Sequence, residues 1–190
     1  MKEFKCDILI VGSGLTGLVS AYVLSKLGYK IIITEQKKAT KNEKFIDDTR
    51  TTAIAEGSKI FLNQIGLWSK ISNFAEKIKN IEVVDRSKTN KINFFNNIKN
   101  ENLGYVVKNS KLIDIIRSGL IKKNNVIFNY NSKLTSIEYM SDKVIGVFKN
   151  KKIISSLLLA ADGKNSTVRQ TLKTLTFNKN YTENALVMNF

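Results

Sequence analysis

Hydrophobic residues near the N-terminus follow the pattern of a strand, a helix and a second strand. Residues 5–11 form an apolar run of strand length that ends at Gly12, which is typical of a buried parallel strand. Residues 17–27 keep an apolar face at helical spacing, and Gly28 follows as a stop signal. Residues 30–34 contain three successive Ile and read as a second strand. We therefore predict a compact βαβ unit.

The pattern changes to short elements after the second strand. Residues 36–49 are polar and irregular, and a helix over 51–65 is predicted to end at Gly66. Short strands are predicted over 81–85, 92–95, 103–107 and 125–130, with an amphipathic helix over 109–121. An antiparallel meander with polar turns follows over 134–139, 143–148 and 152–161, and a last strand over 184–190.

Composition places the chain among globular proteins. Its 190 residues are 43% hydrophobic and 25% charged, enough for one full domain with a core. No run approaches the roughly 20 apolar residues of a membrane span, and we read no targeting segment. The single cysteine, Cys6, fits a reducing compartment and is interpreted as a small buried hydrophobe in the first strand. We expect a cytoplasmic protein.

The net charge of +15 raises the question of nucleic-acid binding. Only four of the 31 basic residues are Arg, and the lysines are spread along the whole chain, many of them at predicted turns. That spread indicates a compositional drift and not a binding groove, so no nucleic-acid partner is expected. A loose peripheral attraction to anionic membrane surfaces, such as the inner membrane, is favoured over it.

The loop after the first strand has the sequence GSGLTG, made of Gly12, Ser13, Gly14, Leu15, Thr16 and Gly17. In a GxGxxG loop the first glycine makes the tight turn, the second lets backbone approach a pyrophosphate, and the third lets the helix pack on the strand. Glu35, followed by Gln36, ends the second strand, where a carboxylate accepts hydrogen bonds from an adenosine ribose. The alternative is a glycine-rich turn with a solvated glutamate. Glu35 argues against a 2′-phosphate but leaves NAD and FAD open.

A second motif, ADGKNSTVR at 161–169, follows the last strand of the meander. Together with GSGLTG it resembles the FAD-dependent aromatic hydroxylases of the p-hydroxybenzoate hydroxylase type. The segments DTRTTAIA (48–55), IEVVDR (81–86), GYVVKN (104–109) and YTENALV (181–187) are similar to the ubiquinone-biosynthesis hydroxylases of that superfamily. These enzymes add a hydroxyl group to a polyprenylated phenol.

The resemblance implies an α/β FAD-binding domain over 1–190, with a Rossmann-like core, the antiparallel meander and the start of a β-rich substrate domain at 80–108 and 181–190. It implies that Arg50 lies along the FAD phosphates or ribityl chain, and that Asn109 falls in a segment that contacts the flavin. Asp162 and Gly163 would close over the cofactor, with Arg169 supporting their loop. Alternatively, Arg50 is a surface charge and Arg169 an ion pair holding its own turn.

The activity implied is that of a monooxygenase in which NAD(P)H reduces FAD and one oxygen atom of O₂ passes to a phenol. No catalytic side chain and no metal is expected, since the cofactor carries the chemistry. The family's Gly-Asp motif and most of its substrate-binding sheet lie beyond residue 190. We therefore expect the N-terminal half of such an enzyme, with a separately encoded C-terminal half or a ubiquinone-biosynthesis complex as partners. The alternatives are an inactive FAD-binding product of a truncated or split gene, and a related flavin epoxidase, halogenase or prenyl reductase.

Overall fold

The computed structural model describes residues 1–37, 50–85, 90–95, 102–183, 185–186 and 188. The chain divides into two compact units. The first comprises Met1–Lys44 and Ile116–Met188, and the second comprises Phe45–Ile115 with Asn189–Phe190. Helix α4 (Asn109–Ile121) contributes residues to both.

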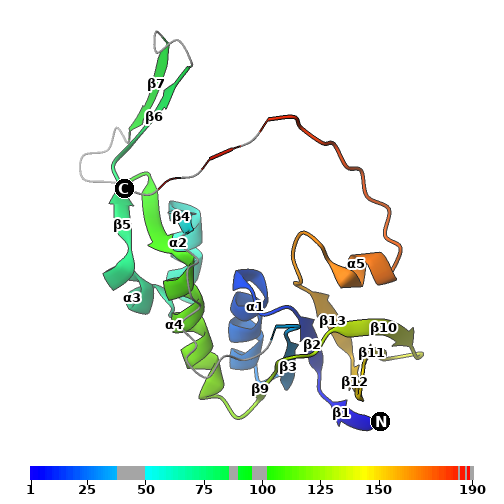
Figure 1. Cartoon of the computed structure of the whole chain (residues 1–190). Coiled ribbons are helices and arrows are strands. Elements are labelled where there is room, and N and C mark those ends of the chain that lie inside the picture. Colours follow the sequence, from blue (N-terminus) through cyan, green and yellow to red (C-terminus); the bar gives the residue numbers. More distant parts are fainter. Residues whose placement is uncertain (38–49, 86–89, 96–101, 184, 187, 189–190) are drawn as a thin grey trace. The chain divides into compact units, whose positions relative to one another are not determined.

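The first unit is built on a parallel sheet of four strands in the order β13-β2-β3-β9 (Figure 1). The strands are β2 (Ile8–Val11), β3 (Ile31–Thr34), β9 (Val126–Asn129) and β13 (Leu157–Ala160). Every residue of β2 and β3 is buried, because both faces of the sheet are covered. The sheet and its βαβ unit confirm the predicted Rossmann-like core.

Helix α1 (Leu15–Lys26) covers one face of the parallel sheet and contacts β2 and β3. Its buried face includes Leu18, Ala21 and Tyr22. The helix begins two residues before the predicted Gly17, directly after Gly14, and Gly28 adopts a φ of +89° beyond its end. That left-handed conformation is the one that glycine adopts without strain, so Gly28 is the predicted stop.

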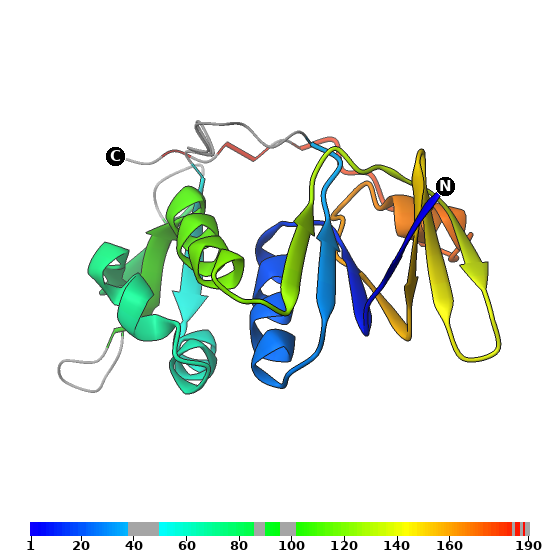
Figure 2. The ribbon, with the colours of Figure 1, turned by 90° about the horizontal axis from the view of Figure 1, so that it is seen from below.

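A second sheet covers the other face (Figure 2). It has the order β1-β12-β11-β10, with β1 (Lys2–Lys5), β10 (Leu134–Tyr139), β11 (Val144–Phe148) and β12 (Lys151–Ser155). The last three form the predicted antiparallel meander. The core between the two sheets joins Leu9, Val11 and Ile32 to Leu134, Phe148 and Ile153.

Two segments far apart in sequence run side by side through both sheets. Lys2–Lys5 pairs in parallel with Lys151–Ile154, and Ile8–Val11 pairs in parallel with Leu157–Ala160 at the same offset. Both segments leave the meander sheet and enter the parallel sheet at the same level. There the Cys6 amide donates to the Ile154 carbonyl at 3.1 Å, and the Ser156 amide donates to the Asp7 carbonyl at 3.1 Å.

This crossing corrects two sequence predictions. The strand predicted over 5–11 is two strands, β1 and β2, and the strand predicted over 152–161 is β12 and β13. An apolar run shows no break where a chain passes from one buried sheet to another, so hydrophobicity alone did not reveal it. Cys6 lies between the two strands and is partly buried, not fully buried within a strand.

The second unit contains a three-stranded antiparallel sheet in the order β4-β8-β5. Its strands are β4 (Thr51–Ala55), β5 (Glu76–Ile78) and β8 (Gly104–Lys108). Helices α2 (Glu56–Gln64) and α3 (Trp68–Ile71) and the short 3₁₀ helix η1 (Ser72–Phe74) connect β4 to β5. The hairpin of β6 (Asn80–Val84) and β7 (Lys91–Phe95) completes the unit, with Ile81 opposite Phe94 and Val83 opposite Ile92, all exposed.

The helix predicted over 51–65 was wrong in its first third. Thr51–Ala55 pairs with β8 over five residues, and only Glu56–Gln64 is helical. The β-branched Thr51, Thr52 and Ile54 favour a strand once β8 supplies a partner, and this tertiary pairing overrides the helical spacing of Ile54 with the residues after it. The strands predicted near 81–85, 92–95, 103–107 and 125–130 and the helix over 109–121 are confirmed to within one or two residues.

The strand predicted over 184–190 falls partly outside the described residues. Among those described there, Ala185, Leu186 and Met188 lie in no strand. The assignment of 80–108 and 181–190 to a substrate domain stays a prediction. No helix among the described residues is long and apolar enough to cross a membrane.

Candidate dinucleotide site

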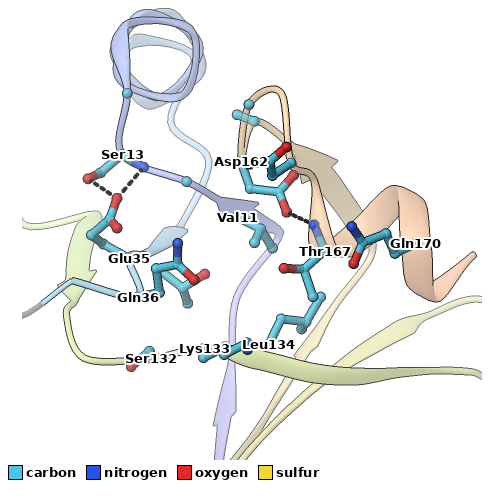
Figure 3. Close-up of a pocket in the computed structure, with 16 residues that line it drawn as sticks. Val11, Ser13, Glu35, Gln36, Ser132, Lys133, Leu134, Asp162, Thr167 and Gln170 are labelled. Carbon is cyan, nitrogen blue, oxygen red and sulfur yellow. Dashed lines mark hydrogen bonds between the residues drawn. The ribbon is translucent and has the colours of Figure 1, made fainter. Parts of the chain in front are cut away.

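A cavity of about 460 Å³ opens in the first unit at the carboxyl ends of β2, β3 and β13 (Figure 3). Its lining comes from five chain segments: Val11–Gly14, Thr34–Gln36, Ser132–Leu134, Ala161–Gly163, and the single residues Asn165, Thr167 and Gln170 around helix α5 (Thr167–Thr171). In open parallel sheets this edge is where ligands bind, because loops from neighbouring strands converge there.

The parallel pairing of β2 with β13 brings the two sequence motifs together. Gly12 follows β2 and Ala161 follows β13, and the Ala161 amide donates to the Val11 carbonyl at 2.8 Å. A β-carbon on Gly12 would overlap the Ala161 carbonyl oxygen, and one on Gly17 would overlap the Gly12 carbonyl oxygen. The first and third glycines are therefore required by the packing of the protein itself.

Gly14 differs from these two glycines. A β-carbon built on Gly14 meets no atom of the described residues within 4 Å, and its φ of −71° is accessible to any residue. It is the N-cap of α1, and no side chain in the described part of the chain caps the helix. Since the first amides of a helix have no partner within the helix, they are available to an anion in the cavity. The open space at Gly14 is the room that a pyrophosphate needs.

Glu35 lies across the cavity from Asp162 and points toward the glycine loop (Figure 3). Its Oε2 atom accepts hydrogen bonds from the Ser13 hydroxyl at 2.7 Å and the Ser13 amide at 3.2 Å. Its Oε1 atom accepts from the Lys37 amide at 3.0 Å. The carboxylate is thus held at the end of β3, beside the loop, where an adenosine ribose is bound in dinucleotide folds.

Asp162 organises the loop on the opposite side. Its Oδ2 atom accepts from the amides of Thr167 at 2.6 Å and Val168 at 3.2 Å, which are the first two residues of α5. The Ser166 hydroxyl accepts from the Arg169 amide at 3.0 Å as the N-cap of the same helix. Asp162 Oδ1 is buried and has no hydrogen-bond partner among the described residues. A buried acceptor needs a donor, and Asp162 lines the cavity, so Oδ1 is a candidate acceptor for a ligand hydroxyl group.

The third wall of the cavity was not anticipated from the sequence. Ser132, Lys133 and Leu134 follow β9, and the amide of Ser132 donates to the Glu35 carbonyl at 2.9 Å. The Lys151 ammonium group donates to Ser132 Oγ at 2.7 Å and so helps to fix this segment. Partial burial lowers the pKa of that ammonium group. Residues 125–130 were predicted as a strand, but the sequence did not show that this strand lies beside β3.

Seven of the twelve predicted cofactor-binding residues line this cavity: Gly12, Ser13, Gly14, Glu35, Gln36, Asp162 and Gly163. Leu15, Thr16 and Gly17 form the first turn of α1 directly behind it. That FAD is what these residues contact stays a prediction. No cluster of metal-binding side chains occurs among the described residues.

Arg50 and Asn109 belong to the second unit. There they are neighbours, since the Asn109 amide donates to the Arg50 carbonyl at 3.0 Å, and the Thr52 hydroxyl donates to the Asn109 side chain. The pairing of β4 with β8 brings them together. Their approach to FAD stays a prediction. Arg169 donates from Nη2 to the Lys164 carbonyl, so it holds its own turn through a backbone carbonyl, and no ion pair of Arg169 occurs among the described residues.

The residues present fit FAD on three observations: the open space at Gly14, the fixed carboxylate of Glu35, and the unpartnered Oδ1 of Asp162. A positive cradle formed by helix amides suits a pyrophosphate, while two carboxylates suit ligand hydroxyl groups. Gly14, Glu35 and Asp162 all line one cavity.

Comparison with known proteins gives the same assignment. Residues 5–190 match the model of the FAD binding domain family. The chain is 28% identical over 202 residues to the ubiquinone biosynthesis monooxygenase COQ6 of Danio rerio, covering 95% of this chain and 41% of that protein. It is 26% identical over 165 residues to the ubiquinone hydroxylase UbiL of Rhodospirillum rubrum, covering 86% of this chain and 38% of that protein.

Solved structures share the fold. The p-nitrophenol 4-monooxygenase PnpA from Pseudomonas putida superposes with a TM-score of 0.76 at 20% identity, over 94% of this chain and 45% of that one. PqsL from Pseudomonas aeruginosa, described as a probable FAD-dependent monooxygenase, superposes with a TM-score of 0.76 at 16% identity, over 93% of this chain and 48% of that one. The chain thus spans about two fifths of its curated relatives. It belongs to the FAD binding domain family.

Proposed function

We propose that this chain is the cofactor-binding, N-terminal part of an FAD-dependent monooxygenase that hydroxylates a polyprenylated phenol in ubiquinone biosynthesis, with NAD(P)H as reductant. The observation that carries the proposal is the parallel pairing of β2 with β13, which joins the glycine loop and the Asp162 loop at one cavity. The similarity to ubiquinone hydroxylases over 86–95% of the chain supports the choice of substrate class.

The roles of individual residues follow from the cavity. The amides at the start of α1 bind the pyrophosphate, Glu35 accepts a ribose hydroxyl, and Asp162 Oδ1 accepts a hydroxyl from the flavin half. FAD, when bound, supplies the redox chemistry with NAD(P)H and O₂. The side chains of this chain bind and orient it and exclude water from one side of it.

The proposal is tested with a chimera that fuses this chain to the remaining C-terminal part of UbiL. We expect the chimera to bind FAD and to form a hydroxylated polyprenylphenol in an NAD(P)H-dependent reaction, while the 190-residue chain alone shows no turnover. A matched chimera carrying Gly14→Ala controls for unbound flavin. A chimera that folds and binds FAD, yet consumes NAD(P)H without hydroxylating any polyprenylphenol, would contradict the proposed substrate class.

The proposal extends to location. A polyprenylated substrate resides in a membrane, and the net charge of +15 favours anionic lipid surfaces. We therefore propose a cytoplasmic protein that associates peripherally with the inner membrane, alongside a C-terminal partner or a ubiquinone-biosynthesis complex. Co-sedimentation with phosphatidylglycerol vesicles, but not with phosphatidylcholine vesicles, is the expected result. Equal recovery with both would remove the electrostatic argument.

A further inference from the structure

The carboxylate of Glu35 is already occupied on most of its acceptor positions. An ionised carboxylate offers about four lone-pair positions, two on each oxygen. Two donors of Ser13 fill those of Oε2, and the Lys37 amide fills one on Oε1. One position on Oε1 remains for a ligand in the cavity.

Ser13 is built to hold that arrangement. It is 6% exposed, and it gives both its backbone amide and its hydroxyl to the same carboxylate oxygen (Figure 3). A free glutamate side chain samples many rotamers, and fixing it costs conformational entropy. Two donors from one buried residue hold the carboxylate before any ligand arrives, so less of that cost falls on binding.

The backbone amides of the GSGLTG segment are divided between two different groups, the Glu35 carboxylate and a ligand phosphate. The Ser13 amide serves the carboxylate, while the amides of the first turn of α1, which begins at Leu15, remain for a phosphate. The ribose end and the phosphate end of the site are therefore set by residues of the same GSGLTG motif, Ser13 on one side of Gly14 and Leu15 on the other.

We propose that Ser13 is a positioning residue that orients Glu35 so that the carboxylate accepts one hydrogen bond, and no second, from the adenosine ribose. The inference rests on the proposed function, because it concerns the adenosine half of FAD. Its consequence is an asymmetric site: removing one of the two ribose hydroxyls weakens binding, and removing the other does not.

The test uses ADP, which carries the adenosine ribose and pyrophosphate of FAD, together with 2′-deoxy-ADP and 3′-deoxy-ADP. Binding to the 190-residue chain is measured by isothermal titration calorimetry. For the wild type we expect one deoxy analogue to bind about tenfold more weakly than ADP and the other within about twofold, since a hydrogen bond to a charged group is lost in one case only.

In Ser13→Ala the carboxylate keeps only one of its two donors from the loop, so its orientation relaxes. In this variant we expect the weaker deoxy analogue to bind within about threefold of ADP, instead of about tenfold more weakly. Ser13→Thr retains the hydroxyl and should restore the larger difference. Gly57→Ala is the matched control, because Gly57 lies in α2 of the second unit, and no described residue outside the helix backbone comes within 4 Å of an added β-carbon. Thermal unfolding checks that each variant is folded.

The outcomes separate the inference from the proposed function. Equal loss from both deoxy analogues in the wild type would overturn the single-acceptor arrangement. If folded Ser13→Ala still binds ADP and still binds the weaker deoxy analogue about tenfold more weakly than ADP, the role of Ser13 is overturned and the proposed function stays intact. Absence of ADP binding in the wild type would contradict the proposed function and this inference with it.

Discussion

The backbones of Gly12 and Ala161 touch at the point where the two motifs meet. Gly12 has a φ of +107°, and a side chain on it would overlap the carbonyl group of Ala161. The contact exists because β2 and β13 run in parallel in fixed register and end together. Gly12, which the sequence predicted only as the tight turn of the loop, is therefore also required by the backbone that follows the neighbouring strand β13.

Gly12→Ala should therefore destabilise the protein even without cofactor. The added methyl group meets a backbone carbonyl that cannot rotate away, and the left-handed φ adds strain. We expect a loss of about 3 kcal/mol in the free energy of unfolding. Urea denaturation followed by circular dichroism measures it, and a loss below about 1 kcal/mol would show that the strands can separate locally.

Gly14→Ala should have the opposite profile. Its β-carbon enters open space, so stability should stay within about 0.5 kcal/mol of the wild type. The same carbon occupies the position through which backbone approaches the pyrophosphate, so FAD affinity should fall at least about tenfold. Flavin fluorescence titration provides the measurement, with Gly57→Ala as the control for an added methyl group in open space. Unchanged FAD affinity would show that the pyrophosphate does not bind at this loop.

Asp162→Ala should loosen the second loop. Two amides at the start of α5 lose their carboxylate acceptor, and we expect unfolding to become easier by about 2 kcal/mol. Asp162→Asn keeps an acceptor oxygen, so its loss of stability should be smaller, while FAD affinity should fall in both. Asp142→Asn, at an exposed acid in the β10–β11 turn, is the control. Equal FAD affinity in the two Asp162 variants and the Asp142→Asn control would show that Asp162 does not contact FAD.

Cys6 should react slowly in the folded protein. Burial raises the pKa of its thiol to about 11 from an ordinary value of 9.0. At pH 8 the fraction of Cys6 present as thiolate is about a hundredfold lower in the folded protein than in the protein unfolded in urea. A thiolate of higher pKa is a stronger nucleophile, which offsets part of this difference. We therefore expect iodoacetamide to alkylate the folded protein about tenfold more slowly than the unfolded protein. Because the folded pKa is raised, the neutral thiol stabilises the fold below pH 9, and this contribution is lost as pH rises from about 9 to 11. Equal rates in both states would contradict the shift.

The sequence predicted the parallel core well because its signals are local. The apolar strand, the glycine loop and the helix are contiguous, and each supports the others. Residues 51–55 were misassigned because their strand depends on β8, about fifty residues further along the chain. Ser132–Leu134 were missed because strand order decides which loops share an edge, and no local pattern encodes that order. The juxtaposition of Gly12 with Ala161 was expected only through family resemblance; the structure supplies its physical cause in the fixed pairing of β2 with β13.

Titration of the purified 190-residue chain with FAD, followed by flavin fluorescence and compared with titration by NADH, tests the central claim most directly. We expect saturable binding of one FAD per chain, competed by ADP, because the cavity at the ends of β2, β3 and β13 recognises the adenosine and pyrophosphate of FAD. NADH alone should bind weakly. Tight NADH binding with no response to FAD would contradict the account and assign the site to a nicotinamide cofactor.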